Sequence, residues 1–432
     1  MSSLTSTITQ AALPLPRQPD LSRIPGDEGA PLVGHTFKQL RDPIAFAEQM
    51  HAKYGPVFRL RAFGRTQLSL LGPDANELVL LNQNKVFSSD LGWSPTLSRL
   101  FPNGLMLLDF EVHRAHRRLM AFAFKPNVMQ GYVAGLNEGI AARVAQWGKT
   151  GRFKFYPAIK QLSLELAAAP FLGIAWGADA QKINTAFAAM VQASIAPVRR
   201  PLPFTQMRKG VKGRETLSAF FSQEIPKRRS TSGEDMLSIL CNAVGDDGKR
   251  YTDQEITDHM TFLMMAAHDT ITSSATSLAH ELGRHPRWQK VLRAEIAEAG
   301  LSEGPVSYDT LPGLTQIEMA FKEALRLHPP VPALPRRTIA DIHFSGFDIP
   351  AGTFVGINPL FTHRMEDHWP DPLRFDPTRF TPENVAKRHK YAWVPFGGGA
   401  HMCLGLHFAH MQAKLLFTHL LRAYEIVLPE GY

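Results

Sequence analysis

The longest stretch of the sequence without a helix breaker runs from Asp253 to Arg284 and contains no proline and only one glycine, Gly283. As a single α-helix these residues would be about 48 Å long at 1.5 Å per residue. Thr252 or Asp253 can cap its first turn, because both residue types accept hydrogen bonds from free backbone N–H groups. The pattern therefore predicts a long helix that crosses the core of the protein.

The middle of this predicted helix changes abruptly from apolar to polar. Residues 260–267 are almost entirely apolar, and His268, Asp269 and Thr270 follow at once. Polar side chains inside a protein core are costly unless they are hydrogen-bonded. We therefore expect water, a ligand or a cofactor beside this point of the helix.

The remaining apolar periodicity predicts several further helices and a small amount of β-structure. Two alternating segments, 57–61 and 67–70, flank Gly64 and are typical of a hairpin. The fold class predicted is mainly α with a small β part. Helical spacing covers residues 37–53, 128–148, 157–171, about 316–327 and about 404–424, and short strand-like pieces cover 337–347 and 353–358.

Composition narrows the class of protein without identifying it. The chain has 432 residues, of which 44% are hydrophobic and 20% charged, which excludes a wholly disordered protein. Residues 1–30 lack the basic start and apolar run of a secretory signal, so we expect a flexible Pro-rich arm there and one domain over 31–432. No eighteen consecutive apolar residues occur, which predicts no membrane-spanning segment. The net charge of +8 is not accompanied by any nucleic-acid-binding motif.

The chain contains only two cysteines, Cys241 and Cys403. This number excludes a disulfide framework and any zinc or iron–sulfur site built from cysteines alone, and it favours a cytoplasmic, reducing location. Cys403 follows the glycines 397–399 and precedes a predicted helix, whose N-terminus favours a thiolate. Such a thiolate suits haem iron, whereas the alternative is a glycine-rich turn beside an inert thiol. Cys241 has no predicted function.

The spacing Phe396-x-x-Gly399-x-His401-x-Cys403-x-Gly405 resembles the haem-binding signature of the cytochrome P450 family. The resemblance covers about residues 30–430. It implies a haem b held between the long central helix and the C-terminal cysteine loop and helix, with Cys403 as the axial thiolate and only metal ligand. It also implies that His401 reaches a haem propionate.

Further segments match other patterns of the family. His113 and Arg117 resemble its propionate-binding pair, and Arg336 should also reach a propionate, although Arg337 is nearly as well placed. The resemblance therefore implies a set of cofactor-binding residues that consists of Cys403, His113, Arg117, Arg336, His401, Phe396, Gly397 and Ala266.

Glu323 and Arg326 resemble the Glu-x-x-Arg motif of the family, and Arg379 lies in a segment that resembles its meander. On a helix, residues three apart share one face. We expect these three residues to form a buried structural network that holds the cysteine loop in place.

Residues 266–270 resemble the oxygen-activation motif of the family, in which Asp269 and Thr270 would be the catalytic residues. By this resemblance they deliver protons for the cleavage of dioxygen. Ala267 stands where the family most often has Gly, which leaves a kink of the helix uncertain. The alternative role of Thr270 is a hydrogen bond to the helix carbonyl four residues earlier.

The variable regions of the family suggest where a substrate would bind, and their apolar content predicts a large hydrophobic pocket. About half of the candidates are expected to be ordinary core residues. The candidates are Phe87, Trp93, Leu97, Leu105, Leu107, Ala267, Val331, Ala333 and Leu334.

The motifs are most similar to those of sterol demethylases and retinoic-acid hydroxylases, here without a membrane anchor. We therefore expect a monomeric monooxygenase that uses dioxygen to oxidise a lipophilic steroid, terpene, retinoid or fatty acid. Electrons would come from a separate ferredoxin and ferredoxin reductase, steered by a basic surface. That surface would comprise Arg114, Arg118, Lys387, Arg388 and Lys390.

Three alternatives remain open at this point. A haem-thiolate peroxygenase, isomerase or dehydratase would need no reductase, but the Asp269–Thr270 pair argues against it. A haem-based sensor or carrier would be expected to carry a fused output module, and none is visible. A helical protein without haem would lack the spectrum of a thiolate-bound haem.

Overall fold

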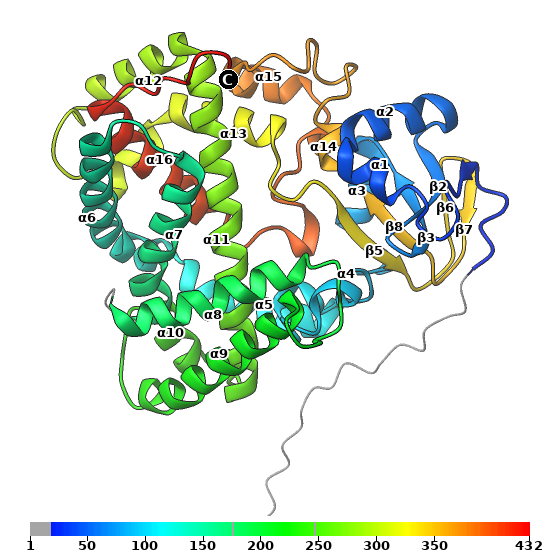
Figure 1. Cartoon of the computed structure of the whole chain (residues 1–432), viewed down its shortest axis with the longest axis horizontal. Helices are drawn as coiled ribbons and strands as arrows, with labels where there is room; N and C mark the ends of the chain where they lie inside the picture. Colours follow the sequence, from blue (N-terminus) through cyan, green and yellow to red (C-terminus); the bar gives the residue numbers. More distant parts are fainter. Residues whose placement is uncertain (1–18, 175–176, 246–247) are drawn as a thin grey trace, which may run out of the picture.

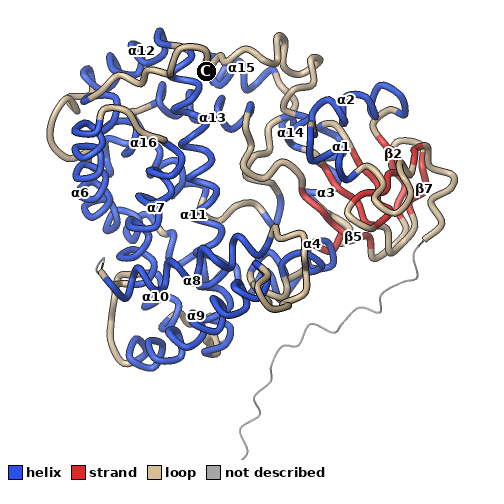
Figure 2. The backbone as a smooth tube through the Cα atoms, in the orientation of Figure 1, coloured by secondary structure: helices blue, strands red, loops and turns tan. Residues whose placement is uncertain are grey.

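The computed structural model describes residues 19–174, 177–245 and 248–432. Figure 1 shows a large helical part on one side and a small twisted sheet, with α1, α2 and α3 beside it, on the other. Figure 2 shows how helix dominates over strand in the described chain. The prediction of a mainly α protein with a small β part is confirmed.

The central helix α11 has the bounds that the sequence predicted, Asp253–Arg284. Thr252 and Glu255 form a capping box at its start, in which each side chain bonds the backbone N–H of the other residue. The helix packs on α7 (Phe155–Leu172), α9 (Gln206–Arg229) and α13 (Thr315–Leu327). Its position in the middle of the helical part is visible in Figure 1.

One predicted helix is divided in two. The segment 37–53 forms α1 (Thr36–Arg41) and α2 (Pro43–Tyr54). Pro43 has no N–H to continue the first helix, and the side chain of Asp42 caps the second by accepting a hydrogen bond from the Ala45 N–H. Local cap chemistry therefore overrides the continuous apolar pattern.

The other helices surround these elements. The C-terminal helix α16 (Leu406–Ala423) and α6 (Pro126–Thr150) pack against each other, as Figure 1 also shows. The remaining α-helices are α3 (Pro73–Leu81), α4 (Ser89–Leu97), α5 (Phe110–Met120), α8 (Ala178–Ser194), α10 (Met236–Asn242), α12 (Pro286–Glu298), α14 (Pro359–Thr362) and α15 (Pro382–Lys387).

The larger sheet has the strand order β1-β2-β3-β8-β5-β4. The predicted hairpin forms its second and third strands, where β2 (Val57–Ala62) and β3 (Arg65–Leu70) pair antiparallel around Gly64, which has a φ of +77°. The other strands of this sheet are β1 (Gly26–Asp27), β4 (Phe87–Ser88), β5 (Leu334–Thr338) and β8 (Phe354–Ile357), and a separate hairpin consists of β6 (Ile342–Phe344) and β7 (Phe347–Ile349).

The N-terminal arm predicted over residues 1–30 lies mainly outside the described residues. Its last part, 19–30, is not a loose arm, because Leu21 and Ile24 are buried against the sheet and β1 pairs with β2. The prediction is therefore wrong for residues 19–30. Burial of two aliphatic side chains and a short strand pairing attach this segment to the domain.

A buried ion pair on α13 is hydrogen-bonded to the chain segment that leads toward Cys403. The side chains of Glu323 and Arg326 are both fully buried, and the Arg326 guanidinium donates two hydrogen bonds to the Glu323 carboxylate at 2.7 and 2.8 Å. Its other N–H groups bond the carbonyls of residues 363, 372 and 374. The Arg379 Nε lies 3.4 Å from the same carboxylate. The three residues of the expected network are thus in contact.

His363 carries this network on to the cysteine loop. Its carbonyl accepts from Arg326, and its Nε2 accepts a hydrogen bond of 2.9 Å from the backbone N–H of Val394, two residues before Phe396. Burial lowers the pKa of His363 to about 3, so the ring is neutral and has the lone pair that this bond needs. The loop that holds Cys403 is therefore connected to α13 through buried hydrogen bonds.

We predict that Arg326→Leu lowers the free energy of unfolding by about 3–5 kcal/mol, because it leaves the buried Glu323 carboxylate without its partner. Denaturant unfolding followed by circular dichroism would measure the change. Lys387→Ala is the matched control, since Lys387 pairs with Glu383 at the surface, and it should leave the unfolding midpoint unchanged. An unchanged midpoint in Arg326→Leu would contradict a stabilising role for the network.

Candidate functional site

The loop before Cys403 depends on two glycines with left-handed backbone conformations. Gly397 has a φ of +70° and Gly399 a φ of +58°. A Cβ atom at Gly399 would lie 2.0 Å from the carbonyl oxygen of Leu80 in α3. The turn closes with a hydrogen bond of 2.8 Å from the Cys403 N–H to the Phe396 carbonyl. Glycine is the residue that fits these requirements. The position of Cys403 is therefore set by the backbone conformation of the loop and by the hydrogen bond of its N–H group.

The Cys403 thiol has an exposed surface, although protein surrounds it closely. This surrounding protein raises the pKa of the thiol, while the Gly405 N–H and the Arg117 guanidinium act in the opposite direction. The balance favours the protonated thiol in the protein alone. A bound metal cation would reverse it, because metal binding releases the thiol proton.

Four basic side chains from three separate segments gather beside this loop. His113 and Arg117 come from α5, Arg336 from β5 and His401 from the loop itself. The two imidazole rings stack with their centroids 3.9 Å apart. Burial and the neighbouring cations lower the pKa of His113 to about 4 and that of His401 to about 2, while burial lowers the pKa of Arg336 to about 10.

Arg336 and Arg337 point to different surroundings. Arg336 is buried and electrostatically coupled to His113, His401 and Asp109. Arg337 instead donates to the Gly352 carbonyl at 2.9 Å and stacks on the ring of Phe354. Of the two candidates that the sequence left open, Arg336 is therefore the one that lies with the other basic side chains.

These basic side chains fit the two carboxylates of a haem. The described carboxylate near them is Asp109, whose oxygen lies 4.0 Å from His401 Nε2, and it already accepts hydrogen bonds from Ser88 and Ser89. Buried cations without enough anions destabilise a protein, and haem propionates would supply the missing charges. A thiolate beside amide donors is also a suitable donor for haem iron. The residues present are thus consistent with haem on chemical grounds.

The middle of α11 presents a partly exposed face although the flanking residues are buried. Ala266, Ala267, Asp269 and Thr270 all keep exposed surface, whereas residues 256–264 are buried. The Thr270 hydroxyl donates a hydrogen bond of 2.6 Å to the Ala266 carbonyl. This is the local bond that the sequence analysis gave as the alternative role. It uses the proton of the hydroxyl and leaves the oxygen free to accept one.

Asp269 has a basic neighbour that the sequence analysis missed. Lys160 of α7 has its Nζ 3.9 Å from Asp269 Oδ1. Burial raises the pKa of Asp269, and Lys160 opposes this effect. No local pattern could have identified Lys160, because the contact depends on the packing of α7 against α11.

The structure separates the expected substrate residues into two groups. Phe87 is buried in the core beneath the sheet, and Leu97, Leu105 and Leu107 are buried in the main helical core. Trp93 is only partly buried, and its indole N–H has no hydrogen-bond partner among the described residues. The partly or fully exposed candidates are thus Trp93, Ala267, Val331, Ala333 and Leu334.

One member of the expected basic surface, Arg388, is partly buried. Arg388 lies over the ring of Trp369, with the guanidinium 3.9 Å from the ring centroid, and burial lowers its pKa to about 10. It also donates to the Arg379 carbonyl. Arg388 thus keeps part of its surface exposed while its guanidinium contributes to packing, and its part in a docking surface stays a prediction. Arg114, Arg118, Lys387 and Lys390 are exposed.

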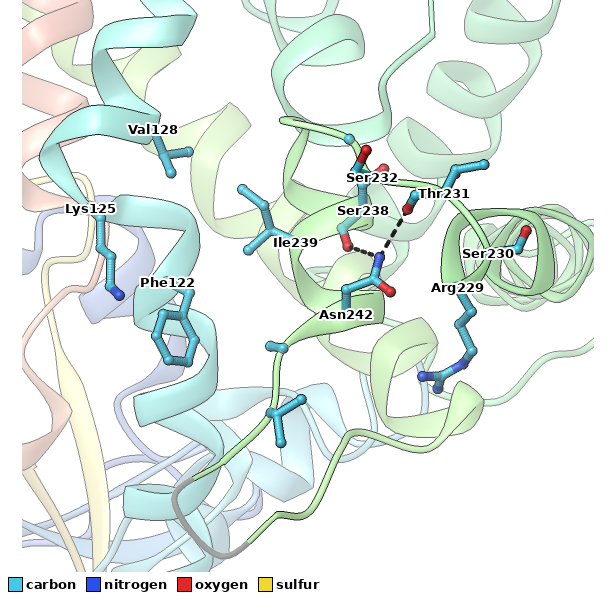
Figure 3. Close-up of a pocket in the computed structure, with 13 residues that line it drawn as sticks. Phe122, Lys125, Val128, Arg229, Ser230, Thr231, Ser232, Ser238, Ile239 and Asn242 are labelled. Atoms are coloured by element: carbon cyan, nitrogen blue, oxygen red, sulfur yellow. Dashed lines mark hydrogen bonds between the residues drawn. The ribbon is translucent and has the colours of Figure 1, made fainter.

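A hollow of about 650 Å³ lies elsewhere on the surface, between the start of α6 and the segment from the end of α9 through α10. Figure 3 shows Phe122 and Lys125 on one side and Arg229, Thr231 and Asn242 on the other. The Arg229 guanidinium is already bonded to Asp253 and to two backbone carbonyls. The hollow shares no lining residue with the cysteine loop or the middle of α11.

Two searches of the described residues gave negative results. No group of three or more His, Cys, Asp or Glu side chains could hold a metal ion in the part of the chain that the structure covers. No helix within residues 19–174, 177–245 and 248–432 combines the length and apolar content needed to cross a bilayer.

Comparisons with known proteins agree with this arrangement. Residues 24–431 match the family model described as "Cytochrome P450". The chain is 39% identical to "Putative cytochrome P450 136" of Mycobacterium tuberculosis, over 94% of this chain and 84% of that protein. It is 28% identical to lanosterol 14-alpha demethylase of Mus musculus, over 93% and 82% of the two chains. The solved structure "Retinoic acid bound cyanobacterial CYP120A1" is 31% identical, with a TM-score of 0.85 and coverage of 94% and 93%.

We predict that the two cysteines differ completely in their effect on the haem spectrum. Cys403→Ser should abolish the far-red-shifted Soret band of the reduced, carbon monoxide-bound protein, because that band requires an axial thiolate. Cys241→Ser is the matched control and should keep the band, since Cys241 is buried in the helical core. Retention of the band in Cys403→Ser would exclude Cys403 as the ligand.

Proposed function

We propose a substrate class for this chain, which belongs to the cytochrome P450 family and is a haem-thiolate monooxygenase. The substrate proposed is a lipophilic small molecule of the steroid, terpene, retinoid or fatty-acid class. The observation that carries the proposal is the exposed or partly exposed apolar set Ala267, Val331, Ala333 and Leu334, which lies on α11 and on the chain from the end of α13 to the first residue of β5. The names of similar proteins, which include a lanosterol demethylase and a taxane hydroxylase, support the same class.

In this proposal Cys403 would bind the haem iron, and His113, Arg117, Arg336 and His401 would bind the propionates. The bound haem would supply the chemistry of dioxygen activation, in which one oxygen atom enters a C–H bond of the substrate. Binding of propionates favours the charged forms of His113 and His401, because a nearby anion raises the pKa of an imidazole.

Asp269 and Thr270 are the residues proposed to move protons during this reaction. The Thr270 hydroxyl donates to the Ala266 carbonyl, so its oxygen can accept a hydrogen bond from the partly exposed side of the helix. Asp269 can hold a proton, because its surroundings raise the pKa of its carboxyl group. In this proposal Asp269 holds the proton, and the hydroxyl oxygen of Thr270 orients its transfer.

Electrons come from a separate redox partner, as the family requires. We propose that this partner is an acidic ferredoxin that docks on the exposed cations Arg114, Arg118, Lys387 and Lys390. The stacking of His113 on His401 places α5 beside the cysteine loop, so a protein bound to α5 is close to the haem edge. Complementary charge would increase the rate of encounter more than the affinity.

A screen of the haem-loaded protein tests the substrate class. Steroids, terpenes, retinoids and fatty acids are added in turn, and the shift of the haem spectrum that reports loss of iron-bound water is recorded. At least one of these classes should give a saturable shift, and small sugars, which carry no nitrogen ligand for the iron, should give none. A shift only with polar compounds would overturn the proposal.

We predict that Thr270→Ala uncouples electron consumption from product formation, with peroxide released instead, because the accepting oxygen is removed. Thr270→Ser keeps that oxygen and is the matched control, so its coupling should stay close to that of the unchanged protein. The measurement is product and peroxide formed per NADPH consumed. Equal coupling in Thr270→Ala would exclude a role for the hydroxyl.

We also predict that Arg114→Glu and Lys390→Glu slow reduction by ferredoxin and weaken its dependence on salt. Arg388→Lys, at a partly buried position, keeps the positive charge and is a control that should leave the salt dependence unchanged. Stopped-flow reduction at several ionic strengths would show the difference. Turnover with peroxide but never with a ferredoxin system would contradict the proposed partner.

A further inference from the structure

Asp109 occupies the N-cap position of α5, but its side chain does not cap that helix. The residue is only 3% exposed. Its carboxylate instead accepts hydrogen bonds from the start of α4, namely from the Ser88 hydroxyl, from the Ser89 N–H at 2.7 Å and from the Asp90 N–H at 3.4 Å. An N-cap aspartate usually bonds a free N–H of its own helix, so this arrangement requires an explanation.

Part of the explanation is that Asp109 completes the cap of α4. The Ser88 hydroxyl accepts a hydrogen bond of 2.9 Å from the Leu91 N–H, so Ser88 and Asp109 together bond the first three N–H groups of that helix. All partners of Asp109 donate, which suits the ionised group, because a carboxylate only accepts. A neutral amide would cap the helix about as well, and a buried charge is costly. Capping alone therefore leaves the charge unexplained.

The other neighbours of Asp109 are basic side chains of the proposed propionate site. Its Oδ1 lies 4.0 Å from the Nε2 atom of His401. Burial lowers the pKa of Arg336 to about 10, and the negative charge of Asp109 opposes this effect. Among the described residues Arg336 makes no ion pair, and its guanidinium donates to the Pro335 carbonyl at 2.8 Å. Asp109 thus acts on Arg336 through charge without occupying its N–H groups.

Backbone contacts fix the position of Asp109 relative to Arg336. Ser88 pairs with Arg337 in the ladder between β4 and β5. A Cβ atom at Gly92 of α4 would lie 2.7 Å from the Cα of Arg336, so this helix packs directly on the strand that carries Arg336. Since α4 holds the carboxylate and also packs on β5, the carboxylate cannot move away without displacing the helix.

The site therefore contains one fixed carboxylate in addition to the two propionates that it would bind. Reduction of the iron by one electron from the redox partner adds a negative charge to this site. A fixed buried carboxylate opposes that reduction and a guanidinium favours it, because buried charges are screened little by salt. Second-shell contacts and burial are among the means by which a protein sets the potential of a haem.

We propose that Asp109 is a positioning residue whose fixed negative charge lowers the reduction potential of the bound haem. It acts through the basic cluster, where it offsets part of the positive charge of Arg336 and His401. The hydrogen bonds from α4 keep it in place when propionates bind to these side chains. The inference rests on the proposed binding of the propionates by Arg336 and His401.

A conservative variant separates this role from helix capping. Asp109→Asn keeps an oxygen that accepts from the Ser89 N–H but removes the charge, so the unfolding midpoint should stay close to that of the unchanged protein. The midpoint potential of the haem-loaded protein, measured by spectroelectrochemical titration, should shift to a more positive value. Asp42→Asn is the matched control, because Asp42 caps α2 at the exposed surface, and it should leave the potential unchanged.

Two outcomes would overturn the proposal. If Asp109→Asn leaves the potential unchanged, whether or not it lowers the unfolding midpoint, the role of Asp109 is structural only. If Asp42→Asn shifts the potential as far as Asp109→Asn does, the effect belongs to the net charge of the protein and not to this position.

A variant of opposite charge keeps this inference separate from the proposed propionate site. Arg336→Gln removes a cation from the same cluster, so it should shift the potential to a more negative value and speed the loss of haem to an excess of a haem-scavenging protein. If Arg336→Gln changes neither quantity, the proposed propionate site fails. If Arg336→Gln changes both and Asp109→Asn does not shift the potential, only the inference about Asp109 fails.

Discussion

The burial of one guanidinium group constrains much of the architecture around the cysteine loop. Arg326 has no exposed surface, so each of its N–H groups needs an acceptor inside the protein. Those acceptors are the Glu323 carboxylate and three carbonyls between residues 363 and 374, which belong to an irregular segment without strong local preferences. A side chain on a helix therefore determines the path of a loop that its own sequence does not specify.

Features that depend on neighbouring residues in the sequence could be predicted, and features that depend on distant contacts could not. The bounds of α11 were predictable because a capping box and a long run without breakers are local features. The cysteine turn was predictable because glycines with positive φ are needed where they occur. The division of 37–53 into α1 and α2 depended on Asp42 and Pro43, which the apolar pattern does not weigh.

Contacts between segments that are distant in the sequence were the main features that could not be predicted. Lys160 is near Asp269 only because α7 packs on α11, and Arg388 is partly buried because its guanidinium lies on Trp369. Phe87 looked like a substrate contact because it is apolar and lies in a variable region, yet it fills the core beneath the sheet. Residue type and spacing identify the chemistry of a side chain, but tertiary packing decides which surroundings it has.

The hydrogen bonds that shape the cysteine loop have a consequence for how the protein is assembled. The Cys403 N–H bonds the Phe396 carbonyl, Gly399 packs on Leu80, and Val394 is attached to His363. All of these contacts are made by the polypeptide itself. We therefore expect the iron-binding loop to reach its conformation during folding of the polypeptide. Haem would then bind to a loop that is already formed, and its binding would not be the step that orders the loop.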